Sequence, residues 1–352
     1  MTTTMFGAGP GARRSMGRIG LWGPPGSGKT TFLAALNIAV LQSADKQIRL
    51  FGTDTDSTVF LKESTAMLTR DRTFPDATEA GKQLSWVLSM DQQIQVPTKL
   101  FGKKQSANVT VDLNLDLLDE PGRMFSDRPA EAADKDDDDS GLGFDSDDDD
   151  PVSQSPDNSA ESVMDQLSGC NGLVLLFDPT REWEEGDMFN YFQGTLLEIA
   201  QRRMMGRAEA GGRLPHYVAV CVTKFDHPDV YRRARRLGYR SFSPYDPYLF
   251  PRVPDEFAEE FFVSLVREAD KGNAELVPNA LRRFFLPERI QFFVTSAIGF
   301  HLNKSSSRFQ EADSMNLAPK PGGGHLIRGP IHPINVVEPL IWLGEHLAGG
   351  TR

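Results

Sequence analysis

A glycine-rich segment near the N-terminus has the residue types and spacing of a phosphate-binding loop. It matches the pattern GxxxxGK[ST] at every fixed position, and its residues are Gly23, Pro24, Pro25, Gly26, Ser27, Gly28, Lys29, Thr30 and Thr31. The glycines let backbone N–H groups close around phosphate oxygens. In such a loop the lysine ammonium bridges β- and γ-phosphates, and the threonine hydroxyl ligates Mg²⁺. The segment is therefore predicted to hold a nucleoside triphosphate.

A second candidate site follows the alternating segment 108–118, where Asp119 and Gly122 form an Asp-x-x-Gly motif. An acid at the end of a strand can hold a water bound to Mg²⁺, and the glycine N–H can reach a γ-phosphate. The motif is short and is not specific by itself. It gains weight from its position between the phosphate loop and the two motifs that follow.

Two further segments could select the base. In Thr223-Lys224-x-Asp226 the carboxylate can accept two hydrogen bonds from the N1–H and N2–H₂ edge of guanine, which adenine lacks. In Ser296-Ala297 a backbone N–H can meet the guanine O6. Because both segments follow apolar runs, they are predicted to lie at the ends of successive strands, the edge where open α/β sheets bind ligands.

The elements that must position these residues are short apolar strands alternating with helices. Continuous apolar runs at 172–177 and 217–222 are typical of strands buried on both faces. Shorter runs at 18–22 and 292–295 precede the first and last motifs, and a helix is expected from the phosphate loop to residue 43. We also expect strands at 47–52, 84–90, 94–101 and 108–118, and helices at 57–69 and 183–205. This order predicts a three-layer α/β P-loop NTPase fold with a mostly parallel, roughly six-stranded sheet.

The domain organisation is predicted to be simple. A single nucleotide-binding domain would cover 17–348 after a flexible N-terminus at 1–16. The same pattern predicts a helical insert at 227–290 and a C-terminal helix at 335–348. Residues 127–165 are rich in acids and poor in aromatics, so they are expected to be a disordered insert.

Charge is distributed unevenly along the 352 residues. The formal net charge is −11, but about −10 of it falls within 131–150, so the rest of the chain is almost neutral. This balance does not favour a general nucleic-acid binder. Cys170 and Cys221 are expected to be reduced, packed thiols. No apolar run reaches the length of a membrane span, and no signal segment is recognisable, so a cytoplasmic protein is expected.

Five arginines lie within residues 231–240. This cluster could bind an acidic partner, the acidic segment of the same chain or nucleic acid, or it could be a solvated helix face. The six histidines are scattered along the chain, so they indicate no metal cluster.

Together the four motifs resemble those of Ras-like (TRAFAC-class) P-loop GTPases, over residues 18–300. The resemblance implies GTP or GDP with Mg²⁺, a switch I threonine at Thr78 with Thr73 as competitor, and a protein effector or regulator. It implies metal ligation by Thr30, Thr78 and Asp119. It also places Lys29, Thr78, Gly122 and Arg123 around the reacting phosphate. Residues 47–69 and 329–340 resemble bacterial double-GTPase proteins encoded beside effectors of conflict systems.

Two departures from the family pattern concern hydrolysis. Arg123 stands where Ras-like proteins have a glutamine that orients the attacking water, and Pro24-Pro25 stiffens the phosphate loop. We therefore expect a switch that hydrolyses GTP slowly, with Arg123 or Arg72 able to stabilise charge on the γ-phosphoryl group. The alternatives are a GTP-binding scaffold with negligible hydrolysis and an ATP-dependent ATPase or kinase.

Overall fold

The structure is a computed structural model of the full chain. It describes residues 13–43, 48–76, 83–97, 104–117, 156–204, 213–269, 271–303, 305 and 307–349. Its strands are β1 (Arg13–Trp22), β2 (Ile48–Gly52), β3 (Leu84–Pro97), β4 (Lys104–Leu117), β5 (Gly172–Phe177), β6 (Tyr217–Val222), β7 (Ser241–Phe242), β8 (Pro251–Arg252), β9 (Ile290–Val294), β10 (Leu317–Pro319) and β11 (His325–Ile327). Its α-helices are α1 (Lys29–Gln42), α2 (Thr55–Ala66), α3 (Pro156–Gly169), α4 (Pro179–Glu185), α5 (Met188–Met204), α6 (Pro228–Arg236), α7 (Asp255–Val266), α8 (Val277–Phe284) and α9 (Glu338–Gly349). A π-helical turn, η1 (Met67–Asp71), continues α2, and three 3₁₀ turns are η2 (Ala274–Leu276), η3 (Pro287–Arg289) and η4 (Glu311–Asp313).

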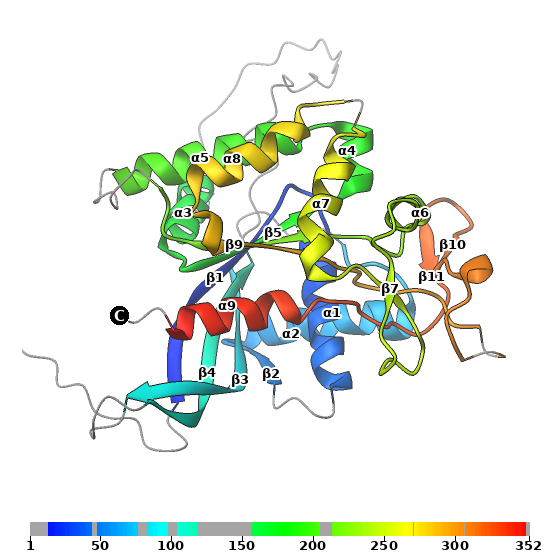
Figure 1. Ribbon diagram of the computed structural model, residues 1–352, viewed down its shortest axis with the longest axis horizontal. Coiled ribbons are helices and arrows are strands. Elements are labelled where there is room, and N and C mark those ends of the chain that lie inside the picture. Colours follow the sequence, from blue (N-terminus) through cyan, green and yellow to red (C-terminus); the bar gives the residue numbers. More distant parts are fainter. Residues whose placement is uncertain are drawn as a thin grey trace, which may run out of the picture.

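Seven strands form the central sheet in the order β2-β3-β4-β1-β5-β6-β9 (Figure 1). The five strands from β4 to β9 are parallel to one another. Only β3 runs against them, because it pairs antiparallel with both β2 and β4. The predicted mostly parallel α/β sheet is thus confirmed, with one strand more than expected.

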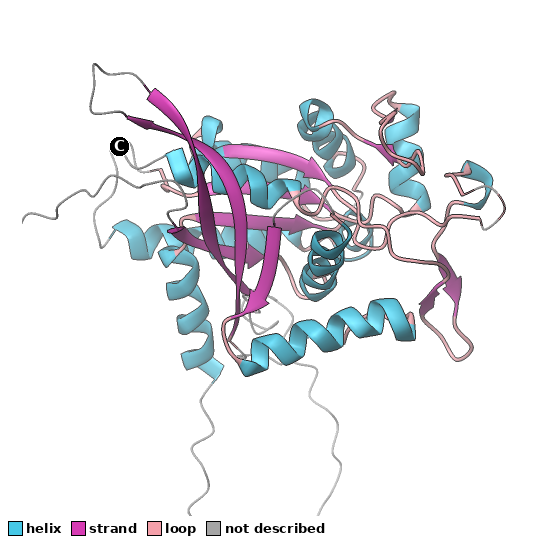
Figure 2. Ribbon diagram, turned by 90° about the horizontal axis from the view of Figure 1, so that it is seen from below, coloured by secondary structure: helices cyan, strands magenta, loops and turns pink. Residues whose placement is uncertain are grey.

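Helices cover both faces of the sheet, which produces three layers (Figures 1 and 2). Alternate side chains of β5 divide between two hydrophobic cores: Leu173 and Leu175 face α3, α5 and α7, whereas Val174 and Leu176 face α1 and α9. β6 divides in the same way. This is why both strands are continuously apolar, since neither face meets water.

The two buried strands have the predicted bounds, and α1 ends one residue before its predicted end. Two other expectations differ from the structure. The segment 84–90 and residues 94–97 of the second segment belong to one long strand, β3, that pairs with β4 over its whole length. Residues 98–101 lie outside the described residues. The expected helix at 183–205 is two helices, α4 and α5, because Gly186 ends α4 in the left-handed conformation (φ 67°). Glycine adopts that conformation without steric cost.

Two boundaries predicted from composition are wrong. Residues 156–165, assigned to the disordered insert, begin helix α3, whose Val163, Met164 and Leu167 are buried in the core. Their spacing forms a local apolar stripe that the polar average of the longer segment concealed. Residues 13–16, assigned to the flexible N-terminus, lie in β1, and residues 13–15 pair with the long strand β4. The rest of the acidic segment, 127–155, lies outside the described residues.

The alternating pattern of β4 is confirmed, but its polar face is not simply hydrated. Asp116 is buried, accepts a hydrogen bond from Ser85 Oγ at 2.6 Å and pairs with Arg18 Nε at 2.9 Å. Ser89 Oγ donates to Asp112 Oδ1 across the same strand pair at 2.7 Å. These cross-strand bonds satisfy the polar side chains and help to fix the β3–β4 register.

No helix within the described ranges is both long and apolar enough to cross a lipid bilayer. Cys170 and Cys221 are free thiols and are buried, as predicted. Burial raises the pKa of the Cys221 thiol well above its usual range. The thiol is therefore expected to be unreactive and to contribute to core packing.

Candidate functional site: the carboxyl edge of the parallel sheet

Four neighbouring parallel strands, β1, β5, β6 and β9, end at one edge of the sheet. The phosphate loop follows β1, and Thr223-Lys224-Phe225-Asp226 follows β6. Ser296 and Ala297 lie just beyond β9. Segments that are at least 70 residues apart in the sequence are thus placed along one edge, as the order of the motifs predicted.

The phosphate loop connects β1 to α1 by a tight backbone path. Ser27 N donates to Pro24 O at 3.0 Å, and Gly28 caps α1 in the left-handed conformation (φ 91°). A Cβ atom at Gly23 would lie 2.7 Å from Ser27 Oγ and 3.0 Å from Leu176 O. The loop therefore requires glycine at position 23 for close approach and at position 28 for conformation. The N-terminus of α1 brings the positive end of its dipole to the same place, which favours a phosphate group.

Lys29 is the first residue of α1, and its side chain is only 5% exposed. Its Nζ donates to Gly23 O at 2.8 Å and to Pro24 O at 3.3 Å. The ammonium is thus held inside the curve of the loop by the loop's own carbonyl groups. A buried cation at this position is suited to contact phosphate oxygens rather than to contribute to the apolar core.

Asp226 is the buried acid of Thr223-Lys224-Phe225-Asp226, the segment that the sequence predicts to select the base. Its Oδ1 accepts a short hydrogen bond from Ser296 Oγ, and Ser296 Oγ in turn accepts from Gly299 N at 2.8 Å. Burial raises the pKa of Asp226 to about 6, and the bond from Ser296 only partly offsets this. The two base motifs predicted from the sequence are therefore in direct contact, through a carboxylate that is mostly ionised near neutral pH.

Lys224 connects the base-selecting segment to α4, in a left-handed backbone conformation (φ 56°). Its Nζ lies 2.6 Å from Asp178 Oδ2 and donates to Thr180 Oγ1 at 2.9 Å. Asp178 also caps α4, because its Oδ1 accepts from Thr180 N at 3.0 Å and from Arg181 N at 3.3 Å. One carboxylate thus fixes both the helix start and the lysine.

Sequence reasoning did not identify Asp178 and Arg181 as site residues. Asp178 is followed by Pro179, the pair expected at the N-cap and N1 positions of a helix, directly after an apolar strand; this signal could have located it. Arg181 Nη1 would be 3.7 Å from a Cβ atom at Gly26, so its guanidinium lies beside the phosphate loop. It is paired with Asp187. No local pattern in the sequence indicates that contact.

Glu182 lies next to Arg181 in α4 and is 1% exposed. Its Oε2 accepts from Met188 N at 3.0 Å, while its Oε1 finds no hydrogen-bond partner among the described residues. Burial raises the pKa of this carboxyl to about 7. It is thus a buried acid in which one of the two carboxyl oxygens accepts a hydrogen bond and the other accepts none from the described residues.

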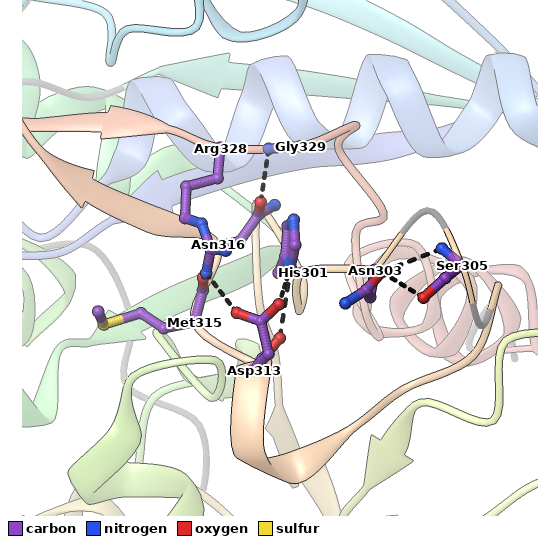
Figure 3. Close-up of polar contacts among 8 residues, drawn as sticks. All are labelled: His301, Asn303, Ser305, Asp313, Met315, Asn316, Arg328 and Gly329. Atoms are coloured by element: carbon purple, nitrogen blue, oxygen red, sulfur yellow. Dashed lines mark hydrogen bonds and ion pairs between the residues drawn. The ribbon is translucent and has the colours of Figure 1, made fainter.

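Beyond Ser296 the chain is held by a polar network (Figure 3). The buried Asn316 donates to Ile298 O at 3.2 Å and accepts from Gly329 N at 2.9 Å. Arg328 Nη1 donates to Asp313 Oδ1 at 2.8 Å, and Asp313 also lies beside the ring of His301. Ser296 itself exchanges backbone hydrogen bonds with Ile334. The base-side loop is therefore fixed from both ends.

The predicted switch I segment begins against this same C-terminal region. Ile327 N donates to Arg72 O at 2.9 Å, and Arg72 Nη1 donates to Arg328 O at 2.9 Å. Phe74 packs against Ile327 in a small apolar cluster. Arg72 is thus bound to the hairpin β10–β11, an arrangement that the proposed role in stabilising phosphate charge does not explain.

Several predicted site residues cannot be located. Thr78 of switch I and the motif residues Asp119, Gly122 and Arg123 lie outside the described residues. The competitor Thr73 is described, and its N donates to Met67 O at 3.0 Å.

Across the described parts of the chain, no three His, Cys, Asp or Glu side chains form a group suited to a metal ion. Of the three predicted Mg²⁺ ligands, only Thr30 is described, in the first turn of α1.

Comparisons with known proteins give structural likenesses only. No family model matches the chain, and no curated protein matches it either. Among solved structures, the Ski7 GTPase-like domain of S. cerevisiae bound to GTP is 14% identical with a TM-score of 0.34; the match covers 97% of this chain and 51% of that one. An Era variant of Aquifex aeolicus bound to GDP.AlF4- is 12% identical with a TM-score of 0.29, covering 80% and 51%. Sup35 complexed with GMPPNP is 11% identical with a TM-score of 0.28, covering 84% and 41%. The chain therefore spans about half or less of these structures, and likenesses of this level do not identify its activity.

Proposed function

We propose that this chain is a P-loop GTPase that binds guanine nucleotides, hydrolyses GTP to GDP slowly and acts as a molecular switch in the cytoplasm. The observation that carries the proposal is the position of Asp226. Its buried carboxylate lies at the same sheet edge as the phosphate loop and contacts Ser296 of the second base motif.

The chemistry of this edge favours guanine over adenine. A buried carboxylate has only acceptor atoms, so it pairs with the N1–H and N2–H₂ groups of guanine. Adenine would present the N1 lone pair to the same carboxylate and leave buried polar groups unpaired, which costs affinity. Lys224 supports this arrangement, because its ion pair with Asp178 fixes the segment that carries Asp226.

The phosphate side fits a Mg²⁺ nucleotide. Thr30 would hold the metal together with the phosphates, and Thr78 and Asp119 are the further ligands that the sequence predicts. Bound Mg²⁺ would neutralise charge on the transferring phosphoryl group. Lys29 would orient the phosphates from inside the loop. Ordering of the segments around Thr78 and 119–123 by GTP, and their release after hydrolysis, would produce the switch, which a protein effector or regulator would read.

The decisive experiment is nucleotide competition against a fluorescent GDP analogue. GTP and GDP should displace the analogue, whereas ATP should not. Asp226→Asn should weaken GTP binding by about 10²-fold, because a bidentate charged hydrogen bond is lost. The same variant should improve XTP binding, because an asparagine amide can donate to the C2 oxygen of xanthine.

Asp229→Asn is the matched control, since it removes an exposed carboxylate three residues further along the same segment. It should leave both affinities unchanged. Equal competition by ATP and GTP, or an Asp229→Asn variant that behaves like Asp226→Asn, would contradict the assignment of the base site.

A scaffold that binds GTP with negligible hydrolysis is the second candidate, because Arg123 replaces the glutamine that would orient water. Single-turnover GTP hydrolysis separates the two functions. If Arg123 stabilises the transition state, Arg123→Ala should slow the reaction by more than about tenfold at unchanged GTP affinity. A wild-type rate slower than GTP dissociation, unaffected by the substitution, would favour the scaffold.

A further inference from the structure

A groove of about 700 Å³ opens between α4, α6 and the end of α7. Trp183 of α4 lines one side, and Glu268, just after α7, lines another. Helix α6 supplies the remaining lining residues, which are Asp229 and four arginines, Arg232, Arg233, Arg235 and Arg236. Trp183 is packed against the main core, so it gives the groove a fixed apolar surface beside its charged ones.

The arginines of the groove share their counter-ions. Glu268 pairs with both Arg233 and Arg236, the second at 2.7 Å. Arg232 Nη2 lies 2.5 Å from Asp229 Oδ1 on the same helix. A guanidinium has five N–H donors. Arg233 uses further donors on Ser264 Oγ and Ser264 O. Among the described residues the Arg236 guanidinium pairs only with Glu268, so most of its donors are available for a ligand.

A third carboxylate, Glu311 of η4, contacts the arginine cluster and is shared in the same way as Glu268. Glu311 pairs with Arg235, and its Oε2 lies 3.0 Å from Arg240 Nη1. Five arginines thus meet three carboxylates, which gives this surface a net charge of +2. The cluster is neither a free basic patch nor a neutral ion-pair network.

The most accessible positive charges are those of Arg232 and Arg236, whose side chains are 63% and 65% exposed. Exposed ion pairs contribute little net stability, about 0 to 1 kcal/mol each. A carboxylate from another molecule can therefore replace Asp229 or Glu268 at little cost. The groove is suited to exchange one anionic partner for another.

We propose that this groove docks an acidic peptide segment of a partner protein. The carboxylates of the segment would pair with Arg232 and Arg236, and an apolar side chain of it would lie against Trp183. This docking site goes beyond the proposed nucleotide function and does not depend on it. The groove lies close to the proposed nucleotide site, because α6 begins two residues after Asp226 and α4 begins directly after Asp178.

The acids of the groove favour a peptide over a nucleic acid. Asp229 and Glu268 line the groove together with the arginines, and they would repel a phosphate backbone, whose exposed groups are all acceptors. A peptide carries backbone N–H donors as well as carboxylates, so it can satisfy both signs of charge in one groove. The almost neutral charge of the rest of the chain gives no longer basic track for a nucleic acid to follow.

The test measures the binding of a short fluorescein-labelled peptide of alternating Glu and Leu residues by fluorescence anisotropy. The full chain should bind it, and affinity should fall as the salt concentration rises. The double variant Arg232→Glu with Arg236→Glu should lose about tenfold or more in affinity. The matched control is Arg282→Glu with Arg283→Glu on α8, where both arginines are also exposed and Arg282 is also ion-paired; it should bind like the wild type.

Each other outcome contradicts the proposal. A peptide of alternating Gln and Leu that binds equally well would show that charge is not recognised. An unstructured RNA oligonucleotide that binds more tightly, and competes with the peptide, would assign the groove to nucleic acid. Binding of the peptide only after deletion of residues 131–150 would assign the groove to this chain's own acidic segment. Thermal melting of each variant establishes that it is folded, and Arg232→Gln with Arg236→Gln gives a milder version of the same test.

Discussion

The sheet edge and the arginine groove are two charged regions that meet at helices α4 and α6 but are built differently. At the edge, three charged side chains are buried and each has a specific partner: Lys29 with the loop carbonyl groups, Asp178 with the exposed Lys224, and Asp226 with Ser296. In the groove, the exposed Arg236 shares Glu268 with Arg233, and the exposed Arg232 pairs with the exposed Asp229 of its own helix.

The difference shows what each arrangement is suited to do. A buried charge with a dedicated partner has one position, and removal of either member leaves an uncompensated group. An exposed charge with a shared partner can change partner at little cost. The edge is therefore expected to impose a strict geometry on a small ligand, while the groove can adapt to a flexible one.

The largest effect is expected for Lys29→Ala at the edge. The substitution removes the only ammonium that the structure shows within the phosphate loop, and GTP affinity should fall by roughly 10³-fold, about 4 kcal/mol. Lys62→Ala, at an exposed position of α2, is the matched control. The measurement is equilibrium binding of GTP, and equal affinities for the two variants would remove the contrast between buried and exposed charges.

A smaller but opposite effect is expected for Glu182→Gln, which should stabilise the protein. Burial raises the folded-state pKa of Glu182 to about 7. Protonation of this carboxyl therefore stabilises the folded state, and the contribution is complete only when the pH is below the ordinary pKa of a glutamate. That contribution is lost as the pH rises through about 7. At about pH 8 the variant should be more stable by on the order of 2 kcal/mol.

The gain from Glu182→Gln should shrink as the pH falls toward the ordinary pKa of a glutamate. Urea unfolding at a series of pH values measures it. A gain that does not depend on pH would mean that the substitution acts through packing instead of through the buried charge.

Guanine binding should weaken in acid, with a midpoint set by Asp226. The pKa of this residue is about 6, and only the ionised carboxylate accepts both hydrogen bonds from the base. Below that pKa the free protein is protonated, so GTP affinity should fall about tenfold for each further pH unit. The same raised pKa means that the stability contributed by this carboxyl is present in acid and lost as the pH rises through about 6.

Isothermal titration of GTP between mildly acidic and neutral pH gives this dependence directly. Asp226→Asn carries no titrating group at this position, so its residual affinity should respond far less to pH. An identical pH profile for the variant and the wild type would place the titrating group elsewhere.

The smallest effect is expected in the groove, for Arg232→Gln. Its ion pair with Asp229 is exposed, so the free energy of unfolding should change by less than about 0.5 kcal/mol. Thermal unfolding at low and high salt measures this. A loss comparable to that of a buried ion pair, several kcal/mol, would show that the groove is as rigid as the edge.

Much of the fold could be predicted because the decisive patterns are local. Continuous apolar runs gave the bounds of β5 and β6, and strict alternation identified β4. Two features that depend on distant parts of the chain could not be predicted. One is the pairing of residues 13–15 with β4, and the other is the burial of the apolar stripe of α3 against the main core. The end of α4 at Gly186 could not be predicted either, because a single glycine is tolerated in many helices.

The candidate site was predictable in its motifs but not in its contacts. Spacing alone identified Lys29 and Asp226, since backbone loops impose a fixed order of residues. The partners of the motif side chains come from distant positions in the sequence. Asp178 pairs with Lys224, and Ser296 donates a hydrogen bond to Asp226. The approach of Arg181 to the phosphate loop depends on the angle at which α4 leaves the sheet, which no sequence pattern encodes.

The last residue of β1, Trp22, lies directly before the phosphate loop and is completely buried. Its indole ring stacks on Phe192 with centroids 5.4 Å apart, in an apolar environment that gives tryptophan blue-shifted emission. Because Trp22 is joined directly to Gly23, a rearrangement of the loop is expected to change the surroundings of the indole ring. The ring is therefore an optical reporter beside the proposed phosphate site. The chain has four tryptophans, so stopped-flow recordings of a variant in which the other three are replaced by phenylalanine would follow nucleotide arrival and departure without a chemical label.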